Sequence, residues 1–479
     1  MSIPAATDSS GKDVITARRK ALLINLDQSR YGTFAEIGAG QEVVRWFFQS
    51  GGAAGTIAKS ISAYDMQVSD AIYGPCKRYV CRHRLQDMLN YEMNLNKERL
   101  SSTRGHDTAF FAFADTVKAA GYRSSADCHG WMGIKFQSHP RDDESQIIIH
   151  VRMLDTDNQA QQEALGIVGV NLIYGACFYF HDPEKLVESL LDNLSTNRLE
   201  IDMIEFSGIE FRHVDNRLMS LKLVQLGLSN AAMFGPDGEV IQPSEALYKK
   251  NILVERGSFR PVCHTNVDII DAAREKFAKE EGVDENDIFV LMELTMNNLM
   301  ATGEIDYPDF LARAELLQAA GYTVLISDYF EYYRLAAYLA RYTKKQIGIS
   351  MGAISLAQLF EEKYYHNLEG GILESFGRLF KNDLKLYIYP YKNRDTGDLL
   401  TTEKINVAEH LKKLYGYLID TGNIEQLDNY RPECLEIFSR DILKKIADSD
   451  SSWEKMVDPK VAKIIKDRGY FGYEKAVAA

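Results

Sequence analysis

The sequence predicts an α/β protein with a mixed α+β N-terminal region, a parallel βαβ region and a helical C-terminal cap. Between about residues 287 and 390, continuous apolar runs alternate with amphipathic helical patterns. That alternation is typical of a parallel sheet built from βαβ units. Between 147 and 233 several strand-like runs follow one another, and from about 401 onward the spacing is helical.

These changes of pattern divide the chain of 479 residues into four parts. We expect a mobile tail over 1–20, an α+β domain with glycine-rich turns over 21–255, the parallel βαβ region over 256–400, and a helical C-terminal subdomain over 401–479.

In the α+β domain we expect a first strand over 21–26 and helices over 82–100 and 106–120. Four further strands are predicted in the runs IIIHVRML, IVGVNLIYG, IDMIEFSGIEF and LMSLKLVQLGL. The longest apolar run, 164–180, is shorter than a comfortable membrane span and contains Asn171, which favours a buried pair of strands.

The later elements have clearer boundaries. Continuous apolar runs predict strands, and apolar residues at helical spacing predict helices. We expect strands over 288–294, 323–327, 346–351 and 384–389, helices over 308–320, 330–342 and 355–365, and a last helix that begins at Asp458-Pro459 and ends at Gly469.

The composition indicates which kinds of molecule the protein binds and in which compartment it works. The net charge of −13 disfavours nucleic acid or an anionic membrane as the main partner, so a small molecule is expected instead. The six cysteines form no Cys-x-x-Cys pair, which suits free thiols in a reducing compartment. With no apolar segment at the N-terminus, these features predict a cytoplasmic protein, and we expect a homo-oligomer.

The segment 31–48, YGTFAEIGAGQEVVRWFF, reads as a strand, a glycine turn and the start of a buried helix. Unpaired N–H groups at a helix start attract anions. We therefore predict that Gly38, Gly40 and Gln41 bind a phosphate through the backbone. The third glycine of a dinucleotide fingerprint is missing, which argues against a Rossmann assignment. The run 53–60, AAGTIAKS, lacks both glycines of a P-loop.

In an open parallel sheet, ligands bind beyond the carboxyl ends of the strands. That rule selects Glu293, Asp328, Ser350 and Gly352. Glu293 lies within an apolar run, and desolvation fits a carboxylate to act as a general base or metal ligand. The alternatives are a hydrogen-bonded structural glutamate and, for Ser350 and Gly352, an ordinary turn between strand and helix.

Arg256 and Arg260 stand out in an acidic protein and flank a glycine turn, so we predict that they clamp a phosphate. A solvated strand edge is the competing interpretation. His129 is the candidate catalytic histidine, and a structural imidazole is the alternative. Neighbouring residues on a strand point to opposite faces, so the Cys128-His129 and Cys263-His264 pairs predict no metal site.

The runs RYGTFAEIGAGQEVVRWFF, HVRMLD, QEALGIVGVNLIYG, RGSFRPV and IGISMG resemble those of a family of uncharacterised bacterial proteins, from about residue 20 to 475. Labels attached to that family include nicotinamide-mononucleotide adenylyltransferase and TonB-dependent receptor. The chain lacks the histidine pair that the first label requires after Gly32-Thr-Phe34, and it shows no outer-membrane strand pattern. The resemblance therefore assigns no catalytic residue.

The predicted function is that of an enzyme acting on a small phosphorylated or nucleotide-like substrate, with nucleotidyl transfer as one reaction. No cofactor is identified, and a nucleotide substrate would bring Mg²⁺. The alternatives are a self-assembling scaffold, suggested by 26 tyrosines and 22 phenylalanines, and a nucleotide-binding regulator.

Overall fold

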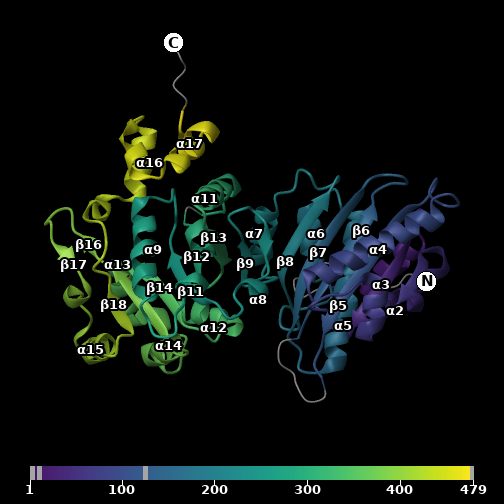
Figure 1. Cartoon of the computed structure of the whole chain (residues 1–479), viewed down its shortest axis with the longest axis horizontal. Helices are drawn as coiled ribbons and strands as arrows, with labels where there is room; N and C mark the ends of the chain where they lie inside the picture. The colour runs from purple at the N-terminus through teal and green to yellow at the C-terminus, as the bar shows by residue number, and fades with distance from the viewer. Residues whose placement is uncertain (1–5, 8–12, 122–127, 302, 475–479) are drawn as a thin grey trace, which may run out of the picture. The chain divides into compact units, whose positions relative to one another are not determined.

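A computed structural model describes residues 6–7, 13–121, 128–301 and 303–474 (Figure 1). Its internal contacts divide the chain into unit 1, Met1–Asn230, and unit 2, Ala231–Ala479. The predicted α/β fold is confirmed, since each unit combines a sheet with helices. Of the predicted tail, residues 1–5 and 8–12 lie outside the described residues, and the first helix begins inside it, at Ala17.

Unit 1 contains a six-stranded mixed sheet in the order β4-β3-β5-β6-β7-β8. β3 runs parallel to β4 and β5, and the strands from β5 to β8 are antiparallel. The strands are β3 Arg30–Gly38, β4 Ile57–Ile61, β5 Ala109–Lys118, β6 His129–Gln137, β7 Glu144–Met153 and β8 Leu199–Gly208, and a separate ribbon pairs β1 Ala6–Thr7 with β2 Asp13–Val14.

Different helices cover the two faces of this sheet (Figure 1). Successive residues of a strand point to opposite faces. Met132 of β6 packs close to Gly169 in α5, whereas the next residue, Gly133, faces Leu85 and Leu89 of α4. The helices of unit 1 are α1 Ala17–Asn25, α2 Val43–Ser50, α3 Met66–Tyr73, α4 Arg82–Leu100, α5 Asn158–Phe178, α6 Pro183–Ser189 and α7 Asn216–Gln225.

Four sequence predictions in unit 1 are wrong. The run 164–180 is not a pair of strands but most of helix α5, and 21–26 belongs to helix α1. LMSLKLVQLGL forms helix α7, and 106–120, expected as a helix, contains strand β5. A fully buried element has no polar face, so its periodicity does not separate helix from strand. The predicted helix α4 and strands β7 and β8 are confirmed.

Unit 2 is built on an eight-stranded sheet in the order β10-β9-β13-β12-β11-β14-β15-β18. The strands from β13 to β18 in that order run parallel, and β9 and β10 complete one edge in antiparallel pairing. The strands are β9 Ala231–Phe234, β10 Val240–Ile241, β11 Asn251–Arg256, β12 Ile288–Thr295, β13 Thr323–Ser327, β14 Ile347–Gly352, β15 Leu384–Tyr389 and β18 Ile424–Gln426, with a ribbon of β16 Tyr391–Lys392 and β17 Leu399–Leu400.

Numbered along the chain, the six parallel strands follow the order 3-2-1-4-5-6 of a doubly wound sheet. The direction of winding reverses between β11 and β14, so the loops that leave these two strands diverge and leave a crevice at the carboxyl edge. The helices are α8 Pro243–Ala246, α9 His264–Phe277, α10 Met296–Leu299, α11 Tyr307–Ala319, α12 Tyr332–Tyr342, α13 Ala353–Leu359, α14 Gly371–Leu379, α15 Lys412–Asp420, α16 Ser439–Ala447 and α17 Pro459–Arg468.

In the parallel region the four predicted strands and the helices over 308–320 and 330–342 are confirmed, as are Asp458 as the cap of α17 and Gly469 as its end. The predicted helix over 355–365 is divided into α13 and a short 3-10 helix, Glu362–Tyr365. The C-terminal region is not wholly helical, because β18 pairs with β15 and so completes the sheet.

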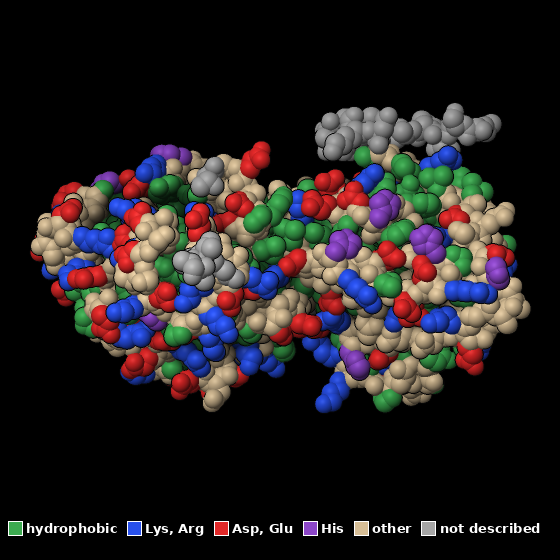
Figure 2. Space-filling view, turned by 90° about the horizontal axis from the view of Figure 1, so that it is seen from above, with side chains coloured by type: hydrophobic (Ala, Val, Ile, Leu, Met, Phe, Trp, Pro, Cys, Tyr) green, Lys and Arg blue, Asp and Glu red, His purple; other side chains and the backbone are tan. Residues whose placement is uncertain are grey.

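Within the described parts of the chain, no helix combines the length and apolarity needed to cross a membrane. On the face seen in Figure 2, acidic and basic side chains are interspersed.

Candidate functional site

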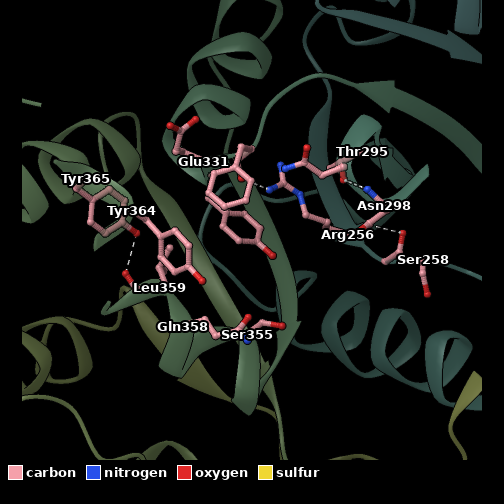
Figure 3. A pocket seen from close by; sticks show the side chains of 14 residues that line it. Arg256, Ser258, Thr295, Asn298, Glu331, Ser355, Gln358, Leu359, Tyr364 and Tyr365 are labelled. Atoms are coloured by element: carbon pink, nitrogen blue, oxygen red, sulfur yellow. Dashed lines mark hydrogen bonds between the residues drawn. The ribbon is translucent and has the colours of Figure 1, made fainter. Parts of the chain in front are cut away.

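A cavity of about 410 Å³ opens in unit 2 at the carboxyl edge of the parallel sheet (Figure 3). Its walls come from the loops after β11, β12 and β13 and from α13 with the 3-10 helix that follows it. It therefore lies where the winding of the sheet reverses, the place where open α/β sheets bind ligands. The lining residues are Arg256, Gly257, Ser258, Thr295, Asn297, Asn298, Phe330, Glu331, Tyr332, Ser355, Gln358, Leu359, Tyr364 and Tyr365.

Arg256, the last residue of β11, is the basic side chain of this lining. Its Nε and Nη2 donate to the two carboxylate oxygens of Glu293, at 2.7 and 3.0 Å, and its Nη1 donates to the Phe330 carbonyl oxygen at 2.7 Å. A guanidinium has five N–H donors, so two are left for a ligand once these three bonds are made. Arg256 is therefore fixed in place before any ligand arrives.

Glu293 holds the Arg256 side chain in place and does not itself line the cavity. Its side chain is fully buried on β12, directly beside Arg256 in the parallel register, and also accepts a hydrogen bond from Ser327 Oγ at 2.6 Å. Burial alone would lower the pKa of the Arg256 guanidinium, but the adjacent Glu293 carboxylate leaves that pKa above its usual value. The Arg256 guanidinium therefore stays charged, and Glu293 positions it.

Aromatic side chains form another part of the wall. The Tyr332 ring lies under the Arg256 guanidinium, 4.2 Å from its centre. The rings of Phe330 and Tyr364 lie 5.5 Å apart, and the Tyr364 side chain faces the cavity in Figure 3. Aromatic walls beside a fixed cation suit a ligand that combines a planar ring with an anionic or polar group.

The loops after β11 and β12 are tied together on the polar side of the cavity. The Asn298 side-chain amide donates to the Gly257 carbonyl at 3.1 Å, and Thr295 Oγ1 accepts from the Asn298 backbone N–H at 3.2 Å. Asn298 and Ser258 therefore offer polar groups to the cavity from loops that hydrogen bonds hold together.

The structure places the other predicted residues of unit 2 apart from this lining. Ser350 is buried and donates to the Val254 carbonyl, and Gly352 precedes α13 as its N-cap. Asp328 is exposed after β13, and Arg260 pairs with Asp309 at 2.6 Å. The sequence did not indicate Asn298, Tyr332 or Tyr364. Asn298 comes shortly after a predicted strand, whereas Tyr332 and Tyr364 fall within predicted helices, so their positions offered no signal.

A second cavity, of about 560 Å³, lies in unit 1 beyond the carboxyl ends of β3 and β5, and its lining includes Gly38, Gln41 and Lys118. At the start of α2, where the anion site is predicted, the carboxyl group of Glu36 bonds to the N–H groups of the helix. The Glu36 carboxyl oxygens accept the backbone N–H groups of Val43 and Val44, at 2.9 and 3.3 Å. An external anion at Gly38–Gln41 therefore stays a prediction.

Glu36 lies beside a second buried carboxyl group, Asp115, directly opposite it on β5. Burial raises the pKa of Glu36 to about 8, although the two N–H bonds oppose that shift. Burial, and then the nearby Glu36 charge, hold the pKa of Asp115 well above its usual range. The pair therefore keeps protons near neutral pH, where exposed carboxyl groups have already lost theirs.

We expect Gly40→Ala to destabilise unit 1, because a methyl group at Gly40 would overlap the buried Asp115 carboxyl group. Overpacking of this kind costs about 1–3 kcal/mol. Gly55→Ala is the matched control, since its new methyl group would only touch the Asn25 carbonyl oxygen at 3.6 Å. Thermal unfolding of the two variants gives the comparison. Equal melting temperatures, or no rescue of Gly40→Ala by Asp115→Ala, would contradict the predicted overlap.

The predicted histidine, His129, lies buried in unit 1 at the start of β6. Its Nδ1 lies 3.0 Å from His150 Nε2, a partner that the sequence did not indicate. The predicted site residues thus fall in both units: Gly38, Gly40, Gln41 and His129 in unit 1, and Arg256, Arg260, Glu293, Asp328, Ser350 and Gly352 in unit 2. Within the described residues, no group of three His, Cys, Asp or Glu side chains is placed to hold a metal ion.

No protein-family model matches the chain, and no curated protein matches it. Solved structures that resemble part of it include the competence/damage inducible protein CihA from Agrobacterium tumefaciens, with 13% identity, 36% of this chain and 93% of that chain covered, and a TM-score of 0.23. A competence-damaged protein (CinA) superfamily protein from Enterobacter cloacae gives 12% identity, 37% and 98% coverage and a TM-score of 0.26. The Escherichia coli protein of that superfamily gives 13% identity, 32% and 84% coverage and a TM-score of 0.22. At these scores the likeness supports no conclusion about function.

Proposed function

We propose that the protein is an enzyme acting on a small phosphorylated or nucleotide-like substrate that binds in the unit 2 cavity. One observation carries the proposal: at the reversal point of a doubly wound sheet, Arg256 is held between the Glu293 carboxylate and the Tyr332 ring, with donors left for a ligand. A guanidinium fixed in this way binds phosphate or carboxylate oxygens without first losing side-chain freedom.

The lining suggests how such a substrate would lie. A planar base or pyridine ring would pack against Phe330 and Tyr364, and its polar edge would reach Asn298 and Ser258. The phosphate end would meet Arg256. Since Glu293 already balances the charge of Arg256, a polyphosphate would enter together with Mg²⁺.

Nucleotidyl transfer is the reaction that we propose first within this class. In a phosphoryl or nucleotidyl transfer, negative charge spreads over the oxygens of the transferred group, and a guanidinium donor at those oxygens stabilises the transition state. Arg256 would take that role. Asp328, which is exposed after β13 and outside the lining, stays an acid–base candidate from the sequence only.

We expect a thermal-shift screen of the full chain against ATP, NAD, nicotinamide mononucleotide, phosphoribosyl pyrophosphate and sugar phosphates, with and without Mg²⁺, to give a stabilising ligand. A ligand at about 100 times its dissociation constant adds roughly 2.7 kcal/mol to the free energy of unfolding. Tyr364→Ala should weaken that ligand at least about fivefold, because it removes the stacking surface. Turnover of the ligand is then followed by phosphorus NMR.

The matched control is Arg378→Gln, which removes an arginine that pairs with Glu374 on α14, outside the cavity lining. Binding should survive this change. A ligand that binds wild type and Tyr364→Ala equally would contradict the assignment of the cavity. Binding without turnover would favour a nucleotide-binding regulator, and no ligand together with a large polymer in solution would favour a scaffold.

A further inference from the structure

Two cysteine thiols of unit 1 lie side by side just before helix α4. Cys76 and Cys81 are separated by four residues in the run CKRYVC, and their Sγ atoms lie 3.9 Å apart. A disulfide bond places its two sulfur atoms about 2 Å apart, so a movement of about the same size joins this pair. Rotation of the two side chains supplies a movement of that size.

A single carbonyl oxygen holds the two thiols together. Cys76 Sγ donates to the Arg78 carbonyl oxygen at 3.0 Å, and Cys81 Sγ donates to the same oxygen at 2.9 Å. Both thiols therefore point to the inside of the 76–81 segment. A thiol is a weak hydrogen-bond donor, so the protein loses little when the two thiols give up these bonds to form a disulfide.

The two thiols differ in exposure and in electrostatic environment. Cys76 is partly exposed, whereas only 8% of Cys81 is exposed. Cys81 is the N-cap residue of α4, and its sulfur accepts the Arg84 backbone N–H at 3.4 Å. The N–H groups at the start of a helix favour a thiolate over a thiol. An oxidant from solvent therefore reaches Cys76 first, and Cys81 is the sulfur that is prepared to attack.

The residues between the two cysteines form part of the unit 1 cavity wall. Tyr79 and Val80 line that cavity. The Tyr79 carbonyl oxygen accepts from Thr116 Oγ1 at 2.7 Å, and its hydroxyl donates to Asp70 at 2.8 Å. Thr116 also lines the cavity. A covalent bond between Cys76 and Cys81 would therefore act directly on a segment of this wall.

We propose that Cys76 and Cys81 are a redox-sensitive modification site, at which a peroxide forms a reversible disulfide that alters the unit 1 cavity. The Cys76 sulfur attacks one peroxide oxygen, the O–O bond breaks, and Cys76 sulfenic acid and water are formed. The Cys81 thiolate then attacks the Cys76 sulfur, the S–S bond forms, and the S–O bond breaks to release hydroxide, which takes the Cys81 proton and leaves as water. Two thiols and one hydrogen peroxide thus give one disulfide and two waters.

The disulfide changes the 76–81 segment in two ways. It closes a covalent ring that contains Tyr79 and Val80, and it removes both thiol donors from the Arg78 carbonyl oxygen. Two thiols that are merely packed together behave differently. Each is oxidised independently, and continued oxidation leads to sulfinic acid, which dithiothreitol does not reduce.

The test uses the full wild-type chain, treated with hydrogen peroxide and then with N-ethylmaleimide to block the remaining thiols. Trypsin cuts after Lys77 and Arg78, so a disulfide joins two peptides that otherwise separate. Mass spectrometry should show the Cys76–Cys81 linked peptide as the main oxidised product, and dithiothreitol should remove it. Cys177, buried in the same unit, should keep its thiol and serves as the reference. Absence of the linked peptide, or sulfinic acid at Cys76 beside an unchanged Cys81, would overturn the proposal.

Cys81→Ser and Cys177→Ala form the matched pair of variants. Cys81→Ser keeps a hydroxyl donor for the Arg78 carbonyl oxygen but removes the attacking sulfur. Sulfinic acid at Cys76 should then rise at least about fivefold under the same peroxide treatment, because nothing resolves the sulfenic acid. Cys177→Ala should leave the Cys76–Cys81 peptide unchanged. If Cys81→Ser does not fold, the wild-type peptide measurement still decides.

Hydrogen exchange of the reduced and oxidised wild-type chain tests the link to the cavity. We expect the exchange rates of amides at 79–81 and at the end of β5 to change on oxidation, because Thr116 of β5 bonds to Tyr79. Peptides from β11 and β12 in unit 2 should be unaffected. A disulfide that forms without any change at 79–81 or β5 would contradict the proposed effect on the cavity.

Discussion

Arg256→Gln is expected to destabilise unit 2 strongly, because it leaves the fully buried Glu293 carboxylate with only the Ser327 hydroxyl for compensation. Removing one partner of a buried ion pair costs about 3–5 kcal/mol. The measurement is urea unfolding combined with hydrogen exchange of peptides from β11 and β12. Peptides from β5 and β6 in unit 1 serve as the internal reference.

The double variant Arg256→Gln/Glu293→Gln tests the reason for that loss. With both charges removed, the two amides can bond to each other, and we expect most of the lost stability to return. Arg378→Gln, which breaks an exposed pair, should cost less than about 1 kcal/mol. An Arg256→Gln loss no larger than that of Arg378→Gln would show that the ion pair does not hold the site together.

Asp115→Asn is expected to stabilise unit 1 at alkaline pH. Burial raises the pKa values of Glu36 and Asp115, so the native state keeps protons that the unfolded chain releases above its ordinary carboxyl pKa values. Native stability is therefore fully present at acid pH and falls as the pH rises toward about 8, the pKa of Glu36. The neutral amide cannot ionise, so it removes the part of that fall to which the Asp115 charge contributes.

The pH profile separates this effect from a general change in packing. Below about pH 3 the two carboxyl groups are protonated in native and unfolded chains alike, so wild type and Asp115→Asn should unfold together. Glu255 in unit 2 is also buried, and burial raises its pKa to about 8. The stability of unit 1 must therefore be measured separately from that of unit 2, by hydrogen exchange of peptides from β3 and β5. Parallel pH profiles of wild type and variant would disprove the shared-proton interpretation.

The sequence predicted unit 2 more accurately than unit 1 for a physical reason. β12, β13 and β15 are short apolar runs separated by amphipathic helices, so strand and helix differ in both length and polarity. In unit 1, α5 is buried along most of its length and carries three glycines, which makes its composition resemble that of a strand. Its identity depends on packing against α1, α2 and the sheet, which one sequence does not display.

The candidate sites show the same limit. The parallel-sheet rule selected Glu293 and the arginine cluster selected Arg256, but their direct pairing depends on the register of β11 and β12. The glycine turn after β3 was found, yet Glu36 from the same segment takes the helix N–H groups. The contact of His129 with His150 offered no signal either, because it forms only after β6 and β7 have paired.

Strand β18 of the C-terminal region covers the edge of the unit 2 sheet, a role that the helices of this region do not indicate. Without that short strand, β15 would be the outer strand of the unit 2 sheet, and its backbone groups from Leu386 to Ile388 would be open to pairing with another chain. The Gln426 side chain stabilises the pairing of β18 with β15. Its amide donates to the Ile388 carbonyl at 2.9 Å, and its oxygen accepts from the Thr402 N–H at 2.8 Å. A shortened chain ending near residue 400 would therefore be prone to aggregate edge to edge, so residues 401–479 also protect the protein against self-association through this edge.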